Sequence, residues 1–364
     1  MSASTLARGV AVGDPSVLFR GAVSVQPGPP GPDGRPLWWA PWRVPYEEAE
    51  LHLPEGGVGR AAMPSGVRIS LRSDSRWLRC RYQADPAPVL NGPQERPRLD
   101  VRVDGRLLRT VRLRADGGDQ EFEVPLGGQR RDRLVELWLP TYNQFRLRLL
   151  EVETRWQPDE RRRPRWVHYG SSISQGRGAA SPSTAWHALV AESAGWDLTS
   201  LALGAACHMQ PMTARLMRDL PAEVLTACVG INSQALGSLG PETFTAAVIG
   251  FVRTVRERHP VTPLMMMSTI YAPDRESVAG PSGLTIEDCR ARTARAVELL
   301  RAAGDLHVHY LDGLKIFGPS DAELMLEPLS IERLHPGPAG HHLFAERFLD
   351  HLGMVPSLIA RVSA

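Results

Sequence analysis

Trp166-Val167-His168-Tyr169-Gly170-Ser171-Ser172-Ile173-Ser174-Gln175-Gly176 is the stretch that decides the fold of the second half of this chain. A short apolar run ends at Gly170, two serines follow, and the next residues can open a helix. This pattern predicts a strand, a tight turn and a helix start, which would place a serine hydroxyl beside free backbone N–H groups. Such a hydroxyl can be a nucleophile, and the N–H groups can stabilise an oxyanion. A serine at a helix start is more often only an N-cap, so the stretch needs support from elsewhere.

That support begins with the rhythm of the chain after Trp166, where apolar strands alternate with helical stretches. This alternation predicts a parallel sheet with helices on both faces, whose active site lies at the carboxyl ends of the strands. The expected strands are 166–169, 198–203, 224–229, 263–270 and 306–311, and the expected helices are 183–194, 209–218, 241–258, 285–303 and 338–352.

The first half of the chain has a different pattern. Its apolar and polar residues alternate with period two, Asp104-Gly105 has the composition of a hairpin turn, and no long helical pattern interrupts the series. We therefore predict an all-β jelly-roll or β-sandwich domain over 1–155, a linker over 156–165 and a catalytic α/β domain over 166–364. The expected strands lie at 67–72, 99–103, 107–113, 122–124, 134–139 and 145–149, with their outward arginines forming a solvated face.

Three tryptophans, Trp38, Trp39 and Trp42, follow a segment rich in glycine and proline. Dense proline excludes long helices from this part of the chain. The tryptophans either pack in the core and at the edge of the β-domain, or form an aromatic platform for a sugar or a polycyclic ligand.

Composition narrows the class of protein. The 364 residues carry a net charge of +2, which gives no reason to expect nucleic acid as a partner. The N-terminal residues contain no apolar segment long enough for a signal peptide, and no apolar run approaches the ~20 residues of a membrane span. We expect a cytoplasmic protein without a membrane partner, with four free thiols at Cys80, Cys207, Cys228 and Cys289. His307 and His309 share a strand face but have no third ligand nearby in the sequence, so no metal is expected.

Three further features fall at strand ends in register with Ser172. Gly204 follows the second predicted strand, where the absence of a side chain lets a backbone N–H approach a ligand. Asn232 follows the third strand and places a side-chain amide at the same rim. His335 precedes a proline, which disfavours helix there, and Glu332 lies three residues earlier, within reach of the imidazole through a turn.

At these four blocks the chain resembles the SGNH, or GDSL, family of serine hydrolases and acyltransferases, over about residues 164–352. The resemblance implies a flavodoxin-like three-layer domain with Ser172 as nucleophile and His335 as general base. It also implies an oxyanion hole formed by the N–H groups of Ser172 and Gly204 with the Asn232 amide. No cofactor is implied beyond an acyl donor.

The chain departs from the family pattern at three positions. Ser171, Glu332 and Ser233 stand where the family usually has aspartates. Glu332 can still orient the imidazole as the third member of the triad, but a backbone carbonyl or Asp321 can take the same role. His208, close to Gly204, and Trp186, early in a predicted helix, are candidate pocket residues, although each also fits an ordinary structural role.

Three functions follow from these observations. In an acyltransferase, a hydroxyl of a larger acceptor resolves the acyl-enzyme. In an esterase or carbohydrate deacetylase, water resolves it and the sandwich binds carbohydrate. A binding module would keep the fold of the family but have no catalytic activity. The last is disfavoured because nucleophile, base and oxyanion groups are all present.

The whole chain resembles GDSL-type tailoring acyltransferases of polyketide antibiotic assembly, which implies transfer of an arylacyl group, such as salicylyl, from a CoA thioester to a polyketide hydroxyl. The oligomeric state stays open.

Overall fold

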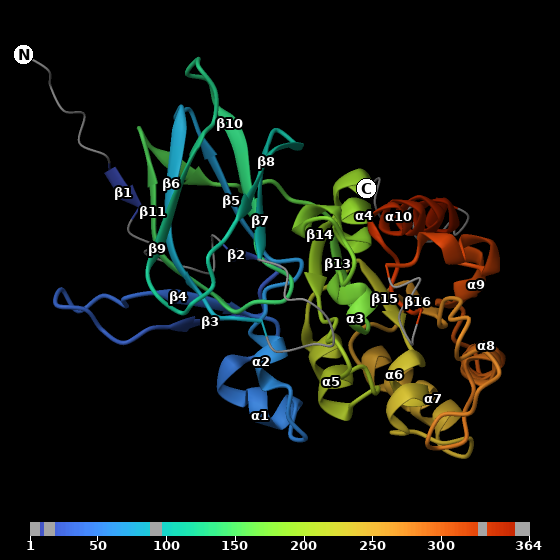
Figure 1. Cartoon of the computed structure of the whole chain (residues 1–364). Coiled ribbons are helices and arrows are strands. Elements are labelled where there is room, and N and C mark those ends of the chain that lie inside the picture. The colour runs from blue at the N-terminus through green and yellow to red at the C-terminus, as the bar shows by residue number, and fades with distance from the viewer. Residues whose placement is uncertain (1–7, 11–18, 88–96, 327–332, 354–364) are drawn as a thin grey trace, which may run out of the picture. The chain divides into compact units, whose positions relative to one another are not determined.

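The computed structural model describes residues 8–10, 19–87, 97–326 and 333–353, and these fall into two compact units (Figure 1). The first unit takes its residues from 1–49, 57–162 and 181–183, and the second from 50–56, 163–180 and 184–364. Part of the predicted linker is regular structure, because β12 (Trp156–Pro158) pairs with β5 (Arg68–Ser73) in the first unit. The stretch between the sheets of the two units is therefore shorter than predicted.

The first unit is built from two antiparallel sheets. One has the order β3-β4-β11-β6-β9, with β1 against β11, and the other has the order β12-β5-β10-β7-β8, with β2 against β5. The strands not yet given are β1 (Arg8–Val10), β2 (Phe19–Arg20), β3 (Ser24–Pro27), β4 (Trp39–Trp42), β6 (Trp77–Ala84), β7 (Arg98–Val103), β8 (Arg106–Arg112), β9 (Gln120–Pro125), β10 (Arg133–Trp138) and β11 (Phe145–Val152).

One core joins these two sheets into a sandwich. Leu71 and Val135 from one sheet and Leu78 and Leu150 from the other are fully buried in the same hydrophobic cluster. Because successive side chains of a strand point to opposite faces, the period-two pattern of the sequence supplies one apolar face per sheet. The helices at the proline-rich start are short, as predicted: η2 (Tyr46–Glu48), α1 (Ala49–His52) and α2 (Val58–Ala61).

The predicted strands of the sandwich did not include β1, β2, β3, β4 or β12, and two further corrections concern β6 and Arg68. Strand β6 was omitted, although Leu78, Cys80, Tyr82 and Ala84 alternate along it and are all buried. Arg68 was expected on the solvated face, but it is 0% exposed and faces Glu136 on the neighbouring strand, with 3.6 Å between Nε and Oε1. The predicted turn at Asp104-Gly105 has positive φ at both residues, as a tight hairpin between twisted strands requires.

The second unit contains a five-stranded parallel sheet in the order β14-β13-β15-β16-β17. In chain order this is 2-1-3-4-5, the flavodoxin-like arrangement, and the predicted fold class is confirmed. The strands are β13 (Arg165–Tyr169), β14 (Asp197–Ser200), β15 (Val224–Cys228), β16 (Leu264–Met267) and β17 (Val308–Leu311).

Helices lie before and after these strands. The predicted long helices are present as α4 (Trp186–Ala194), α5 (Pro211–Asp219), α7 (Phe244–Arg256), α8 (Ile286–Ala302) and α10 (Pro338–Gly353). The prediction did not include the shorter α6 (Ile231–Leu236), α9 (Gly313–Ile316), η3 (Pro182–Thr184) and η4 (Pro319–Leu324); α3 (Ser172–Gln175) is the helix start predicted after Gly170. No helix in the described part of the chain is long and apolar enough to cross a membrane.

Alternate residues of β13 face opposite sides of the sheet. Trp166 packs with Trp186 of α4 and Phe348 of α10, whereas Tyr169 stacks on Phe251 of α7. Trp186 is 0% exposed and stacks on Phe344 with 4.4 Å between ring centroids. It therefore belongs to the core and not to a pocket, because the apolar face of α4 must cover one side of the sheet.

Candidate active site

Ser172 stands at the start of a one-turn helix directly after the first parallel strand. Ser171 is the extended N-cap, and Gly176, with φ of +96°, ends the helix after Gln175. Gly170 is required by close packing, because a Cβ there would lie 2.5 Å from the Ser174 hydroxyl. The turn thus places the Ser172 hydroxyl at the carboxyl edge of the sheet, and its side chain is partly exposed.

His335 meets this hydroxyl from the other end of the domain. Ser172 Oγ lies 2.8 Å from His335 Nε2, and the histidine is 8% exposed. A serine hydroxyl at hydrogen-bond distance from an imidazole nitrogen is the geometry of nucleophile activation by a general base.

The segment around His335 is held on both sides. The Leu326 N–H donates to the His335 carbonyl at 2.7 Å. Arg333 binds the Asp274 carboxylate through its backbone N–H at 3.0 Å and through Nη2 at 2.9 Å. These bonds lower the pKa of Asp274. Gly178 packs so tightly beneath the loop that a Cβ there would lie 2.0 Å from the Pro336 carbonyl oxygen. The ring of His335 therefore has a fixed backbone support.

Gly204 and Asn232 also lie at this edge. A Cβ built on Gly204 would be 3.5 Å from the Ser172 Cβ, so the glycine adjoins the nucleophile. The Gly204 N–H donates to Gln175 Oε1 at 2.6 Å. Asn232 is the second residue of α6 and is 6% exposed; its Oδ1 accepts the Cys207 N–H at 3.0 Å. The sequence prediction did not single out Gln175, although it lies three residues after Ser172 on the same helical turn.

The remaining predicted site residues lie as follows. Glu332 is outside the described residues. Asp321, the alternative partner for the imidazole, accepts hydrogen bonds from Arg347 and from the Gly318 N–H, so its carboxylate is committed elsewhere. His208 is half-buried between the Ser238 hydroxyl, 2.7 Å from Nδ1, and the Ala205 carbonyl, 3.3 Å from Nε2. Burial lowers the pKa of His208.

Two buried histidines support the site without reaching Ser172. His341 accepts the Trp186 N–H at Nδ1, 3.1 Å away, and its Nε2 lies 2.9 Å from the Arg177 carbonyl, next to Gly178. His168 lies 2.8 Å from the Thr226 hydroxyl at Nδ1. Burial lowers the pKa of His168 to about 3 and that of His341 to about 4. Both imidazoles are therefore neutral at physiological pH.

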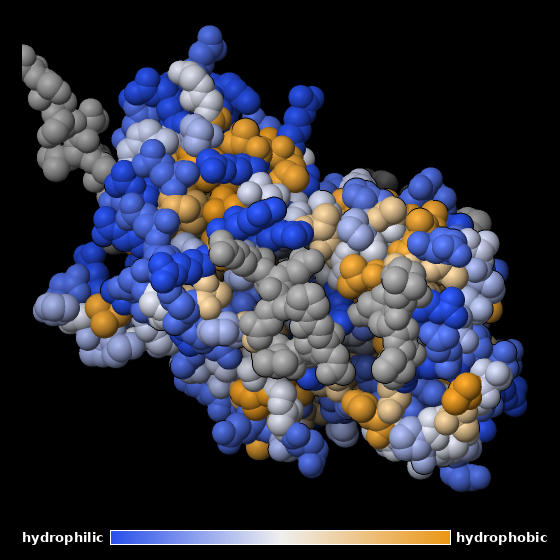
Figure 2. Space-filling view, viewed as in Figure 1, coloured by the Kyte–Doolittle hydropathy of each residue, from blue (hydrophilic) through white to orange (hydrophobic). Residues whose placement is uncertain are grey.

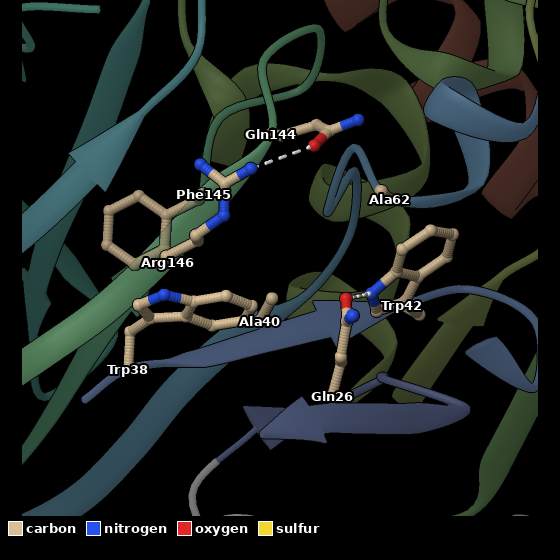
Figure 3. Close-up of a pocket in the computed structure, with 8 residues that line it drawn as sticks. All are labelled: Gln26, Trp38, Ala40, Trp42, Ala62, Gln144, Phe145 and Arg146. Carbon is tan, nitrogen blue, oxygen red and sulfur yellow. Dashed lines mark hydrogen bonds between the residues drawn. The ribbon is translucent and has the colours of Figure 1, made fainter. Parts of the chain in front are cut away.

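The structure confirms the packing role for one of the three tryptophans of the sandwich, and the role as a platform for a ligand stays a prediction. Trp39 packs against the sandwich core, whereas Trp38 and Trp42 line a cavity of about 270 Å³ (Figure 3). Trp42 Nε1 donates to Gln26 Oε1 at 3.0 Å. Arg146 covers the Trp38 ring at 5.4 Å from its centroid and is paired with Asp85, so the cavity has no unbalanced charge.

A parallel sheet in flavodoxin-like order, with a serine hydroxyl on a histidine at its carboxyl edge, defines a GDSL-type enzyme of acyl transfer. Residues 168–343 match the model of the GDSL-like Lipase/Acylhydrolase family, and residues 17–148 match the model of the SsfX3 N-terminal domain. The chain belongs to the GDSL family, in the branch that carries this N-terminal domain.

The particular protein that the whole chain resembles is the salicylyl-acyltransferase SsfX3 from a tetracycline biosynthetic pathway. The two share 44% identity over 98% of this chain and 100% of that one, with a TM-score of 0.87. A putative GDSL-like lipase from Bacteroides ovatus ATCC 8483 covers 93% of this chain and 95% of its own at 18% identity and a TM-score of 0.72. A family two carbohydrate esterase from Clostridium thermocellum covers 81% and 94% at 14% identity and a TM-score of 0.59. The last two show the fold alone. A search of curated proteins found no match.

Proposed function

We propose that the enzyme moves an arylacyl group, such as salicylyl, from a CoA thioester to a hydroxyl of a polyketide, through an acyl-enzyme at Ser172. The observation that carries the chemistry is the 2.8 Å contact between Ser172 Oγ and His335 Nε2. The 44% identity with a salicylyl-acyltransferase over nearly the full chain supports the substrate class. The proposal needs no bound cofactor and places the reaction in the cytoplasm, where CoA thioesters are at hand.

The proposed first half-reaction breaks the thioester. His335 accepts the Ser172 proton as Oγ attacks the acyl carbonyl, and the negative charge on the carbonyl oxygen is stabilised by hydrogen bonds at the strand ends. The proposed donors are the N–H groups of Ser172 and Gly204 and the Asn232 side-chain amide. When the oxyanion collapses, the C–S bond breaks, and the CoA thiolate takes the proton from His335.

The second half-reaction forms the product ester. The acceptor hydroxyl attacks the acyl-enzyme while His335 takes its proton, and the same proton then returns to Ser172 Oγ as the acyl bond to serine breaks. In the alternative, an esterase, water takes the place of the acceptor. The fold shared with carbohydrate esterases does not favour either outcome, because it is common to both reactions.

Mass spectrometry of the intact protein after brief exposure to acetyl-, benzoyl- and salicylyl-CoA tests this proposal. We expect a mass gain that maps to Ser172, is absent in Ser172→Ala, and decays faster with a polyketide alcohol than with water. Ser174→Ala is a matched control, since this buried hydroxyl has no hydrogen-bond partner among the described residues. No gain from any thioester, together with turnover of simple esters or acetylated sugars, would establish the esterase instead.

A further inference from the structure

The Tyr169 hydroxyl lies at the end of the strand that leads to the nucleophile. Tyr169 is the last residue of β13, three residues before Ser172, and is 0% exposed. Its ring stacks on Phe251 of α7 with 5.3 Å between ring centroids. Burial raises the pKa of Tyr169 well above its ordinary value, so the hydroxyl keeps its proton and can both donate and accept a hydrogen bond. The proposed reaction does not use this hydroxyl.

The same hydroxyl holds the turn that follows β14. It accepts the Met209 N–H at 2.9 Å and donates to Gln210 Oε1 at 2.8 Å. Gln210 in turn accepts the His208 N–H at 3.2 Å and donates to the Ala206 carbonyl at 2.7 Å. Three backbone groups of the turn are therefore tied, directly or through one side chain, to a single buried oxygen atom.

The backbone of this turn has an unusual conformation. Ala205 and Met209 have φ of +55° and +57°, in the left-handed region that residues other than glycine seldom adopt. Such a conformation persists only where the surrounding structure fixes it. Because the Met209 N–H binds the Tyr169 hydroxyl, this hydrogen bond holds one of the two unfavourable residues in place.

The turn also orients Asn232. Cys207 donates its backbone N–H to Asn232 Oδ1 at 3.0 Å, and the two residues are 1% and 6% exposed. Because Oδ1 accepts this hydrogen bond, the other end of the amide carries the hydrogens of Nδ2. The position of the turn thus sets the direction in which a proposed oxyanion donor faces.

We propose that Tyr169 is a positioning residue for the oxyanion hole, whose hydroxyl holds the turn after β14 so that the Cys207 N–H orients Asn232 toward the acyl oxyanion. The inference rests on the acyl-enzyme at Ser172 proposed above. Tyr169 itself does not touch the reacting atoms. An oxyanion donor acts chiefly in the transition state, so loss of the hydroxyl should lower kcat and leave KM nearly unchanged.

Removal of the hydroxyl alone tests this role. Tyr169→Phe keeps the ring against Phe251, and we expect kcat for release of CoA from salicylyl-CoA to fall about 10-fold, with KM changed by less than about 2-fold. Tyr82→Phe is the matched control, because Tyr82 is also buried and its hydroxyl accepts a backbone N–H, that of Arg114 at 3.0 Å. Both variants should melt at lower temperature, but only Tyr169→Phe should lose kcat. A wild-type kcat in Tyr169→Phe, an equal loss in Tyr82→Phe, or a change in KM alone would overturn the inference.

A double-mutant cycle shows whether the loss passes through Asn232. In the Asn232→Ala enzyme no side-chain amide is left to orient, so adding Tyr169→Phe should lower kcat further by less than about 2-fold. Losses that multiply in full would overturn the inference. Gln210→Met breaks the same network at a half-buried position and should show the same coupling, so it decides the question if Tyr169→Phe does not fold.

The same cycle on 4-nitrophenyl acetate separates the inference from the proposed function. A wild-type enzyme that hydrolyses this ester but releases no CoA from salicylyl-CoA would refute the proposed function, and the cycle on the ester would still decide the role of Tyr169. A wild-type enzyme that releases CoA, beside a Tyr169→Phe enzyme with the same kcat, would refute the inference alone.

Discussion

The sandwich and the parallel-sheet unit bury polar groups in different ways. The sandwich buries charge as pairs: Arg68 and Glu136 are 0% and 1% exposed, and the Arg68 guanidinium also lies over the Trp138 ring. The parallel-sheet unit also buries an ion pair, Arg256 with Asp305, but it adds two neutral buried imidazoles, His168 and His341, and gathers its reactive groups at the strand ends. The difference teaches that a buried ion pair is a means of folding common to both units, whereas only the parallel-sheet unit also places reactive polar groups together in a site.

The surfaces of the two units differ less than their interiors do. In the view of Figure 2 most of the surface is hydrophilic, with scattered hydrophobic side chains. In the sandwich, partly exposed ion pairs such as Arg81 with Glu121 contribute to this surface. Water and salt screen exposed ion pairs of this kind, so they contribute little to stability. The difference between the two units therefore lies in their buried polar groups.

The largest expected effect is at the strand ends of the parallel-sheet unit. Ser172→Ala and His335→Ala should each lower kcat by about 10⁴-fold or more, because nucleophile and base act as a unit. The double variant should be no slower than the worse single one. Steady-state kinetics measure the effect, and unchanged melting temperatures would confirm that these residues serve chemistry. If the losses in kcat add up in the double variant, Ser172 and His335 do not act as one catalytic unit, and the contrast between the two units of the protein fails.

In the sandwich the corresponding loss is one of stability. Arg68→Ala removes the guanidinium that faces the buried Glu136 carboxylate, and we expect the free energy of unfolding to fall by about 3–5 kcal/mol. Chemical denaturation measures the change. The double variant Arg68→Met with Glu136→Leu should recover most of the loss, because an apolar pair can replace a buried ion pair. Arg81→Ala, which removes an exposed arginine, is the control. If Arg68→Ala lowers the free energy of unfolding by less than Arg81→Ala does, the buried pair does not stabilise the fold.

Asn232→Ala should remain folded but lower kcat by about 10²–10³-fold, on the order of 3 kcal/mol, through loss of an oxyanion donor. Asn232→Asp is the informative partner, because it retains the oxygen that accepts the Cys207 N–H and loses the amino group. If the aspartate enzyme has wild-type kcat, Asn232 supports the backbone only, and the parallel-sheet unit would resemble the sandwich in its use of polar groups.

Gly178→Ala should disturb the histidine loop. Its φ of +91° is unfavourable for alanine by about 1–3 kcal/mol, and the new Cβ would also lie 2.0 Å from the Pro336 oxygen. Gly195→Ala is the matched control, with φ of +66° and no atom within 4 Å of the Cβ. Both should lower stability, but only Gly178→Ala should also lower kcat. Equal kcat values in the two variants would show that catalysis tolerates a displacement of the loop that carries His335.

For one imidazole and one pH unit, the smallest expected effect is the response to acid. The pKa of His168 falls from 6.5 to about 3 on folding, and that of His341 to about 4, so their stabilisation is complete above pH 6.5 and is lost as pH falls toward these values. Each imidazole should then cost about 1.4 kcal/mol per pH unit over that range. Hydrogen bonds from Arg76 lower the pKa of Glu153 from 4.5 to about 2, so this part of the sandwich loses stability only below pH 4.5. Denaturation between pH 7 and 4.5 should flatten in His168→Gln; an unchanged slope would refute this assignment.

Much of this architecture was predictable from local pattern. The period-two runs and the strand–helix alternation predicted both fold classes, since each pattern reports which face of an element is buried. The sequence left Trp186 with two roles, packing or pocket lining, and the structure places it in the core, because only the covering of the sheet by α4 and α10 decides between them. The solvated face predicted for Arg68 was wrong for a related reason: its partner Glu136 is distant in sequence.

The sequence by itself determined the order of the elements and the residues that follow each strand: Ser172, Gly204 and Asn232 occupy strand ends because the chain places them directly after apolar runs. The tertiary structure alone decided that His335, 163 residues from Ser172, brings Nε2 within 2.8 Å of Oγ, and that the Met209 N–H is directed to the Tyr169 hydroxyl. A strand end is a local property of the chain. The direction of a single hydrogen bond depends on packing among segments that meet only in the folded protein.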